Sequence, residues 1–430
     1  MSRTRIWRAA VGVEQAVIEG VEFEEDGQVV VVRVRPGRRS RSRCGVCRRR
    51  CRGYDRGAGR RRWRHLDAGL VQIQVEADAP RVSCRQHGVV VAHMPWARHG
   101  AGHTRAFDDT VAWLAVTTSK TAVTMLMRIA WRTVGAIVAR VGQEAMAASD
   151  RFAGLSRIGI DEISYKRGHR YLTVVVDHDS GRLVWAAPGR DKATLRMFFD
   201  LLGPERSALI THISADAADW IADVVAERCP NAVRCADAFH VVAWATSALD
   251  EVRRQAWNEA RHAISGRRNG RTNGGRARID ASGAARALKH ARYALWKNPE
   301  NLSEKQTAKL AWIAKTDPRL HRAYLLKEGL RHVFAVKGQE GKDALDRWLS
   351  WARRCRIPSF VDLARKIVRH RASIDATLQH GLSNALIEST NTKIRLLTRI
   401  AFGFKNIDAL IALAMLALGG YRPNLPGRPT

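Results

Sequence analysis

Short apolar segments alternate with amphipathic segments between residues 157 and 235. Some of these segments alternate polar and apolar positions or are rich in β-branched residues, which is typical of strands. Others repeat apolar positions every three or four residues, which is typical of helices. Asp179-Ser180-Gly181 separates two strand-like segments and predicts a hairpin turn. This alternation predicts an α/β sheet. The predicted strands are 157–163, 171–176, 183–187, 208–213 and 232–235, and the predicted helices are 192–202 and 220–228.

The N-terminal part of the chain combines strand patterns with a pair of helices. The alternating run Val29–Val34 predicts a strand that leads into a basic loop, and residues 70–75 are also strand-like. Apolar positions at helical spacing fill residues 108–141, and this spacing breaks around Ala130. These patterns predict a small β module followed by helices that a turn separates.

The pattern after His240 is almost wholly helical until about residue 418. A glycine-rich basic stretch, residues 266–275, interrupts it and predicts a loop. Three proline-containing pairs mark further helix boundaries, because the residue before a proline disfavours the helical conformation. These pairs are Asn298-Pro299, Asp317-Pro318 and Ile357-Pro358.

Composition and charge narrow the class of protein. The chain has 430 residues, enough for two to four domains, and its 73 lysines and arginines exceed its 41 acidic residues to give a formal net charge of +32. Such an excess is typical of proteins that bind nucleic acid. The longest apolar run near the C-terminus, 409–418, is far shorter than the roughly 20 residues that span a bilayer. Residues 2–25 contain no signal-peptide core, so we expect an intracellular protein with no membrane partner.

Arginines are concentrated in one N-terminal segment. Residues 33–64 hold fifteen arginines and one acidic residue, Asp55. Clustered arginines predict contacts with DNA phosphates, and a solvated surface is the alternative interpretation. The candidate DNA-binding residues of this segment are Arg48, Arg49, Arg50, Arg60, Arg61 and Arg62.

Two pairs of potential metal ligands lie in or near this segment. Cys44 and Cys47 are three residues apart, and Cys84 and His87 have the same spacing. Each pair places two ligands on one tight turn, as a tetrahedral Zn²⁺ site requires. The odd total of seven cysteines does not favour a disulfide framework, so we predict structural zinc in a fold resembling a zinc ribbon. Spacing alone leaves two competing ligands, Cys51 and His65, and also leaves a site without metal as the alternative.

Residues 118–140 predict a helix, a turn and a second helix that begins at Trp131. Arg128 and Arg132 flank this turn, and Arg140 lies further along the second helix, where each is available for phosphate contacts. The position beside a predicted zinc module favours a helix-turn-helix that binds DNA. An ordinary helical hairpin is the alternative.

Carboxylates at the ends of predicted strands are the candidates for catalysis. Asp161 ends one apolar strand and Asp216 follows another, so both can lie at the carboxyl edge of a sheet. Neighbouring carboxylates repel unless cations join them, and Mg²⁺, or Mn²⁺ in its place, is a cation that prefers oxygen ligands. Two such ions would activate an attacking oxygen and stabilise a leaving oxygen in phosphodiester displacement.

Glu388 is the candidate for the third carboxylate. It lies in a helical stretch with Asn391, Thr392 and Arg395 three, four and seven residues later, which gives the helix one polar face. Lys393 and Arg395 are further candidates for DNA contacts. Spacing leaves several other carboxylates open, namely Glu162, Asp177, Asp179, Asp219 and Asp237.

Three motifs resemble those of the DDE transposases of the ISL-three family of bacterial insertion sequences. They are Ile160-Asp161-Glu162, Asp237-Ala-Phe-His240 and Ser383-Asn384-Ala-Leu-Ile-Glu388-Ser-Thr-Asn391. Residues 288–302, 317–330 and 400–406 are also similar to that family, so the resemblance extends from about residue 40 to 418. Two features depart from it: His87 stands where a fourth cysteine is common, and Ala385 and Ile387 replace smaller or charged neighbours of Glu388.

The resemblance implies a ribonuclease-H-like catalytic domain whose triad matches Asp161, Asp216 and Glu388. The first two are 55 residues apart and the last two are 172 apart, so the second interval implies an inserted helical domain at 245–372. Asp237 and His240 match an accessory motif near the active site, for which a capped helix with a packed histidine is the alternative.

The predicted order of domains is a zinc-ribbon module at 1–100, an all-α helix-turn-helix at 101–150, the first part of an α/β catalytic domain at 151–244, the all-α insertion, and a final catalytic part at 373–430. We expect a DNA transposase that binds the terminal inverted repeats of its element and target DNA, as a homodimer or higher oligomer, in the bacterial cytoplasm at the nucleoid. The alternatives are a non-catalytic DNA-binding regulator and a nuclease without strand transfer.

Overall fold

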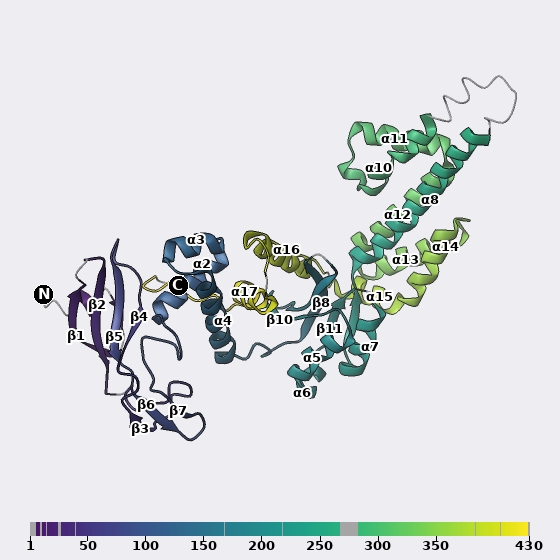
Figure 1. Cartoon of the computed structure of the whole chain (residues 1–430). Helices are drawn as coiled ribbons and strands as arrows, with labels where there is room; N and C mark the ends of the chain where they lie inside the picture. The colour runs from purple at the N-terminus through teal and green to yellow at the C-terminus, as the bar shows by residue number, and fades with distance from the viewer. Residues whose placement is uncertain are drawn as a thin grey trace. The chain divides into compact units, whose positions relative to one another are not determined.

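The computed structural model describes the chain except residues 1–5, 9–10, 14, 25–26, 39, 167, 217, 267–282, 383, 405 and 429–430. Two compact units are present (Figure 1). The first joins residues 1–151 to residues 393–430, and the second contains residues 152–392.

The N-terminal part of the first unit contains two small sheets. The first has the order β1-β2-β5-β4, in which β2 pairs with β5 in parallel and the outer pairs are antiparallel. Val32, Val75 and Trp63 are buried in its core. The second sheet is antiparallel, with the order β3-β6-β7. The strands are β1 (Ala16–Phe23), β2 (Val29–Pro36), β3 (Arg52–Asp55), β4 (Arg60–Arg64), β5 (Gln72–Asp78), β6 (Arg81–Cys84) and β7 (Gly88–Val91).

Several described helices lie wholly within the first unit, which also contains the end of helix α16 (Ala385–Ile400) from Lys393 onward. They include α2 (Arg105–Thr117), α3 (Lys120–Met127), α4 (Trp131–Ala148) and α17 (Ile407–Leu418). The predicted break near Ala130 is confirmed, because Arg128 ends α3 in the left-handed conformation and Ala130 is the N-cap of α4. Helix α17 packs against α4 and α2. No single described helix is long and apolar enough to cross a membrane; α3 and α4 meet that test only as a pair, bent by 101°.

The second unit contains a five-stranded sheet with the order β10-β9-β8-β11-β12. Strand β9 is antiparallel to its two neighbours, β8 and β10, whereas β11 is parallel to both β8 and β12. The predicted hairpin is therefore confirmed between β9 and β10. The strands are β8 (Arg157–Lys166), β9 (Arg170–Asp177), β10 (Leu183–Pro188), β11 (His212–Ala215) and β12 (Val233–Ala236).

Three helices accompany this sheet, and one of them corrects a predicted boundary. They are α5 (Lys192–Leu202), α6 (Pro204–Ala208) and α7 (Asp219–Arg228). The strand predicted at 208–213 begins only at His212, because Pro204 starts a short helix that extends to Ala208. Helices α5 and α7 bury apolar faces in one core with the sheet, where Phe198 contacts Phe152, Trp185 and Phe199.

A series of helices follows β12 and has a core of its own. Helices α8 and α12 pack side by side and extend away from the sheet (Figure 1). Pro318 and Pro358 begin helices as predicted, and the loop predicted at 266–275 lies almost entirely outside the described residues. The elements are α8 (Ala238–Gly266), α10 (Arg292–Trp296), η1 (Pro299–Asn301), α11 (Glu304–Thr316), α12 (Pro318–Val336), α13 (Gly338–Arg354), α14 (Pro358–Arg369) and α15 (Arg371–His380). Helix α16 (Ala385–Ile400) follows them and packs on β8 through Ile387.

We predict that Phe198→Ala lowers the free energy of unfolding of the second unit by about 3–5 kcal/mol, because it leaves a cavity among three aromatic neighbours. Urea titration followed by tryptophan fluorescence measures this change. Met197→Ala is the matched control on the same helix, since Met197 is 57% exposed, and it should change stability by less than about 0.5 kcal/mol. Equal destabilisation by the two variants would contradict this account of the core.

Candidate functional site

Three aspartates form one row across neighbouring strands of the second unit. Ile160 of β8 pairs with Ala215 of β11, and Ala215 pairs with Ala236 of β12. The next residue along the chain is an aspartate in each case, inside β8 for Asp161 and directly after β11 and β12 for the other two, so Asp161, Asp216 and Asp237 share a row. Because paired strands lie about 4.8 Å apart, this register brings three carboxylates to one place on the sheet.

His240 in the first turn of α8 links two members of this row. Its Nδ1 lies 2.6 Å from Asp237 Oδ2 and its Nε2 lies 3.7 Å from Asp216 Oδ2. The hydrogen bond to Asp237 raises the pKa of His240 to about 9, although burial opposes the charge. Asp237 also accepts the backbone N–H of Phe239, so the pair both caps α8 and places an imidazolium beside the aspartate row.

Helix α16 contacts the first aspartate of the row. Asn391 Nδ2 donates to Asp161 Oδ2 over 2.7 Å, and the other oxygen of Asp161 accepts the backbone N–H of Glu162. Asn391 is 3% exposed, and burial raises the pKa of Asp161. Ile387, one turn before Asn391, packs on Gly159, where a Cβ atom would lie 2.3 Å from Ile387 Cδ1. Strand β8 and helix α16 are therefore held in register by an apolar and a polar contact.

Glu388 lies on this same helix, one turn before Asn391, and its side chain is exposed. Strand register and the contacts of His240 bring Asp161, Asp216 and Asp237 together. Glu388 is connected to this row through Asn391 on the same helix. Among the described residues, no carboxylates form a group of three whose ligand atoms all lie within 4.8 Å of one another.

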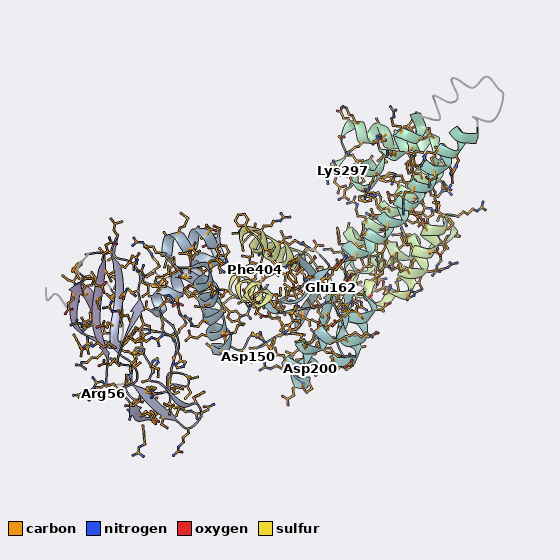
Figure 2. The ribbon with its side chains drawn as sticks, in the orientation of Figure 1. Arg56, Asp150, Glu162, Asp200, Lys297 and Phe404 are labelled. Carbon is orange, nitrogen blue, oxygen red and sulfur yellow. The ribbon has the colours of Figure 1, made fainter. Side chains whose placement is uncertain are left out.

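The other candidate carboxylates have different surroundings. Glu162, labelled in Figure 2, is half-buried, and Arg190 Nε lies 3.5 Å from its Oε1. Asp177 accepts N–H groups in the turn between β9 and β10, where Asp179 pairs with Arg157. Asp219 begins α7 and is exposed.

Two residues that support the row were missed by sequence reasoning. Arg234 in β12 donates from Nη2 to the backbone oxygens of Asp216 and Ala218, and thereby fixes the loop after β11. An arginine inside a short, otherwise apolar strand was the available signal. Gly159 carried no signal, because its role depends on contact with α16.

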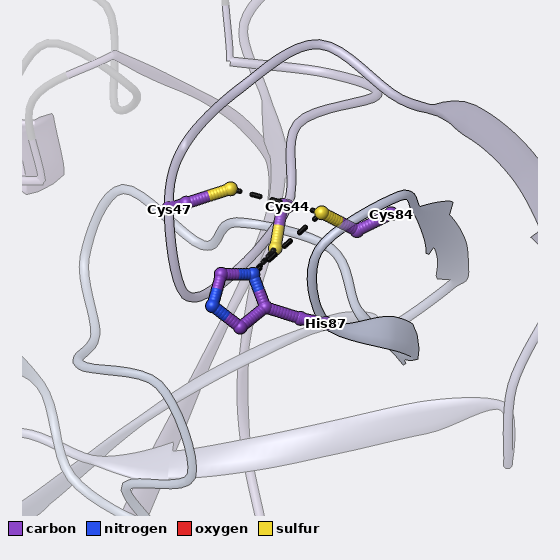
Figure 3. A group of neighbouring side chains, drawn as sticks. All are labelled: Cys44, Cys47, Cys84 and His87. Carbon is purple, nitrogen blue, oxygen red and sulfur yellow. Dashed lines mark hydrogen bonds between the residues drawn. The ribbon is translucent and has the colours of Figure 1, made fainter.

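The predicted zinc ligands converge in the first unit (Figure 3). Cys47 Sγ lies 3.7 Å from Cys84 Sγ, and His87 Nδ1 lies 3.7 Å from Cys44 Sγ and 3.6 Å from Cys84 Sγ. A tetrahedral Zn²⁺ site, with bonds of about 2.3 Å to sulfur and about 2.0 Å to nitrogen, separates its ligands by about 3.5–3.8 Å. The four residues therefore fit the ion.

The competing zinc ligands lie outside this group. His65 is buried and its Nδ1 lies 2.8 Å from the hydroxyl of Thr104, the N-cap residue of α2. Cys51 donates to the backbone oxygen of Arg49 and is not part of the four-residue cluster. The backbone N–H of Gln86, followed by the His87 side chain, lowers the pKa of Cys84 to about 6, which favours the thiolate that a metal binds.

Family models match three consecutive parts of the chain. One described as transposase matches residues 158–414, more than half of the chain. The chain belongs to the ISL3 family of transposases. A helix-turn-helix model of transposase family ISL3 matches residues 92–142, and a model for the zinc finger of transposases IS204, IS1001, IS1096 and IS1165 matches residues 40–87. The order of zinc ribbon, helix-turn-helix and transposase domain is therefore confirmed.

Individual relatives of this ISL3 family member are transposases of insertion sequences. The chain is 68% identical over 436 residues to the transposase for insertion sequence element IS1557 of Mycobacterium tuberculosis, in strains CDC 1551 / Oshkosh and ATCC 25618 / H37Rv, covering 100% of this chain and 98% of the relative. It is 24% identical over 393 residues to the transposase for insertion sequence element IS1001 of Bordetella parapertussis, covering 90% and 92%.

The candidate DNA-binding arginines of the ISL3 transposase fall into two groups. Arg49, Arg50 and Arg132 are exposed, as are Lys393 and Arg395 on α16. The others have partners within the protein. Arg60 and Arg62 form ion pairs with Glu76, and Arg48 lies 3.4 Å from Glu144. Arg61 and Arg128 donate hydrogen bonds to the backbone oxygens of Ala101 and Leu70. Arg140 pairs with the buried Asp108.

We predict that the purified protein carries about one zinc ion, and that Cys84→Ser loses it, because three remaining ligands hold Zn²⁺ too weakly. Elemental analysis of the purified protein measures the zinc content. Cys51→Ser is the matched control and should retain the metal, since Cys51 lies outside the cluster. Zinc retained by Cys84→Ser and absent from Cys51→Ser would show that the ligand set is wrong.

Proposed function

We propose that this ISL3 transposase catalyses Mg²⁺-dependent DNA cleavage and strand transfer with Asp161, Asp216 and Glu388. The observation that carries the proposal is the row formed by Asp161 and Asp216 on parallel neighbouring strands. Helix α16, which holds Asp161 through Asn391, also carries Glu388 one turn away. All the donor atoms are carboxylate oxygens, which suit Mg²⁺ and Mn²⁺.

A ribonuclease-H-like catalytic domain is part of this proposal. Its support is a mixed sheet with flanking helices, in which Asp161 lies in the central strand β8 and Asp216 follows the neighbouring strand β11. The helices between β12 and α16 have a separate core, which supports an insertion at 245–372 that divides the catalytic domain into 151–244 and 373–430. The zinc-ribbon module and helix-turn-helix would then occupy 1–100 and 101–150.

In the first step, water attacks a phosphorus atom at the transposon end, a new P–O bond forms, and the 3′-oxygen leaves as a free hydroxyl. In the second step, this 3′-hydroxyl attacks a phosphorus atom of target DNA and displaces the target's own 3′-oxygen. Bound Mg²⁺ supplies activation of the attacking oxygen and stabilisation of the leaving oxygen. Asn391 orients Asp161, and Arg234 fixes the loop that carries Asp216.

We predict that Asp161→Asn, Asp216→Asn and Glu388→Gln each abolish Mg²⁺-dependent nicking of end DNA, since each removes a negative ligand but preserves shape. Gel assays with labelled terminal repeats measure nicking and strand transfer, and mobility shifts measure binding, which should survive. Mn²⁺ should replace Mg²⁺.

Asp219→Asn is the matched control, because this aspartate lies three residues after Asp216 but outside the row, at the start of α7. Wild-type nicking by Glu388→Gln would show that another carboxylate is the third ligand. Nicking without joined products would favour a nuclease that lacks strand transfer, and binding without nicking by the wild type would favour a DNA-binding regulator.

We predict that Arg49→Ala combined with Arg50→Ala lowers the salt dependence of end binding, by roughly 0.9 in the slope for each DNA phosphate that is no longer neutralised. Both side chains are exposed beside the zinc cluster. Binding titrations at several salt concentrations measure the slope. Arg319→Ala combined with Arg331→Ala removes equal charge from pairs with Glu259 and Glu300, and should leave the slope unchanged. An unchanged slope in the variant that lacks Arg49 and Arg50 would show that these arginines form a solvated surface and do not contact DNA phosphates.

A further inference from the structure

Phe402 at the C-terminal end of α16 combines backbone strain with exposure to solvent. Its φ is +54° and its side chain is 88% exposed. Its N–H donates to the backbone oxygen of Arg399 over 3.0 Å, and the N–H of Gly403 donates to Thr398 over 2.8 Å. These bonds close the helix, so the phenylalanine occupies the left-handed position where glycine is usual.

This arrangement is costly for stability. A side chain in the left-handed conformation costs about 1–2 kcal/mol, and glycine would close the helix without that cost. Exposed aromatic surface also forfeits the stabilisation that burial provides. Phe404, two residues later, lines an apolar pocket with Val134 of α4 and Leu413 of α17, so packing explains Phe404 and does not explain Phe402. A strained residue without a packing role is evidence for function.

The surroundings of Phe402 indicate the kind of partner. Arg395 and Arg399 lie four residues apart on one face of α16, and Phe402 follows the last residue of that helix by two positions. Arg395 and Arg399 are both exposed, and residues 393–402 contain no acidic residue. Arginines that meet phosphates beside an aromatic ring that stacks on a base are the combination by which proteins bind unpaired nucleic acid.

We propose that Phe402 stacks on an unpaired base of the transposon-end DNA, while Arg395 and Arg399 contact the phosphates on either side of it. This inference rests on the proposed function, because it takes end DNA as the substrate. Extruding a base costs a few kcal/mol, and stacking on an aromatic side chain returns about 1–3 kcal/mol. Helix α16 also carries Glu388, two turns before Arg395, so one helix contributes to both cleavage and the unpaired base.

The first test measures base unpairing without cleavage. End duplexes carry 2-aminopurine at successive positions, and the protein is added with Ca²⁺ in place of Mg²⁺. Fluorescence should rise at one position with the wild type and with Phe402→Tyr, and should not rise with Phe402→Ala. A uniform, unchanged signal along the duplex with the wild type would overturn the inference, whether or not the protein cleaves DNA.

The second test measures cleavage. Phe402→Ala should nick a fully paired end about 5- to 160-fold more slowly than the wild type, which corresponds to removing about 1–3 kcal/mol of stacking. A mismatch at the position found by fluorescence should restore most of the rate, because the base is already unpaired. An equal defect on paired and mismatched ends would overturn the inference. If the wild type nicks neither end, the proposed function fails and the fluorescence test still decides the role of Phe402.

Two variants separate this role from a structural one. Phe402→Gly should be at least as stable as the wild type in thermal melting, since glycine relieves the left-handed strain, and yet should give no fluorescence signal. A destabilised Phe402→Gly would indicate that the ring packs within the protein. Phe23→Ala removes another phenylalanine that is 63% exposed, and it should leave the signal unchanged.

Discussion

Electrostatic repulsion within the row of Asp161, Asp216 and Asp237 is the constraint around which the second unit is organised. Adjacent members of such a row lie about 5 Å apart, and at an effective dielectric constant near 20 two unit charges at that distance repel by about 3 kcal/mol. A single hydrogen bond returns only about 1 kcal/mol, so positive charge is needed nearby. The imidazolium of His240, between Asp216 and Asp237, provides it in the protein itself. A cation bound by the carboxylates would add to this compensation, and DNA phosphate would then meet a site that no longer repels it.

Close backbone approach is the second requirement of the same site. Gly159 lets α16 approach β8 closely enough for Ile387 to pack and for Asn391 to reach Asp161. Helix α16 follows the series of helices that has its own core, and these two contacts fix the register at which it packs on the sheet. Because this register depends on side chains on both elements, residues far apart in the chain fix the geometry of one carboxylate.

Much of the sheet could be predicted from the sequence, because β8, β9, β10 and β12 are short apolar runs whose ends are marked by turn residues. The strand β11 was displaced, since Pro204 starts a helix where apolar spacing suggested extended chain. Strand β4 could not be predicted: four of its five residues are arginines, and Glu76 on β5 and Glu24 stabilise two of them. Asp216 follows β11 as predicted, whereas Asp161, which was predicted to end its strand, lies inside β8, which continues to Lys166. The row with Asp237 required the observed register. Arg234 and Gly159 depend on contacts that no local pattern contains.

The connection of α17 to the first unit has a consequence for synthesis of the protein. This helix packs on α4 and α2, yet it follows them in the chain by more than the length of the whole second unit. A nascent chain that has emerged from the ribosome only as far as the helix-turn-helix lacks the apolar surface that covers it, and contacts between such distant segments form late in folding. The helix-turn-helix fold is therefore completed only after the whole second unit has been translated. An interrupted product of translation would carry an unfinished helix-turn-helix, and it would compete poorly with full-length protein for the same DNA ends.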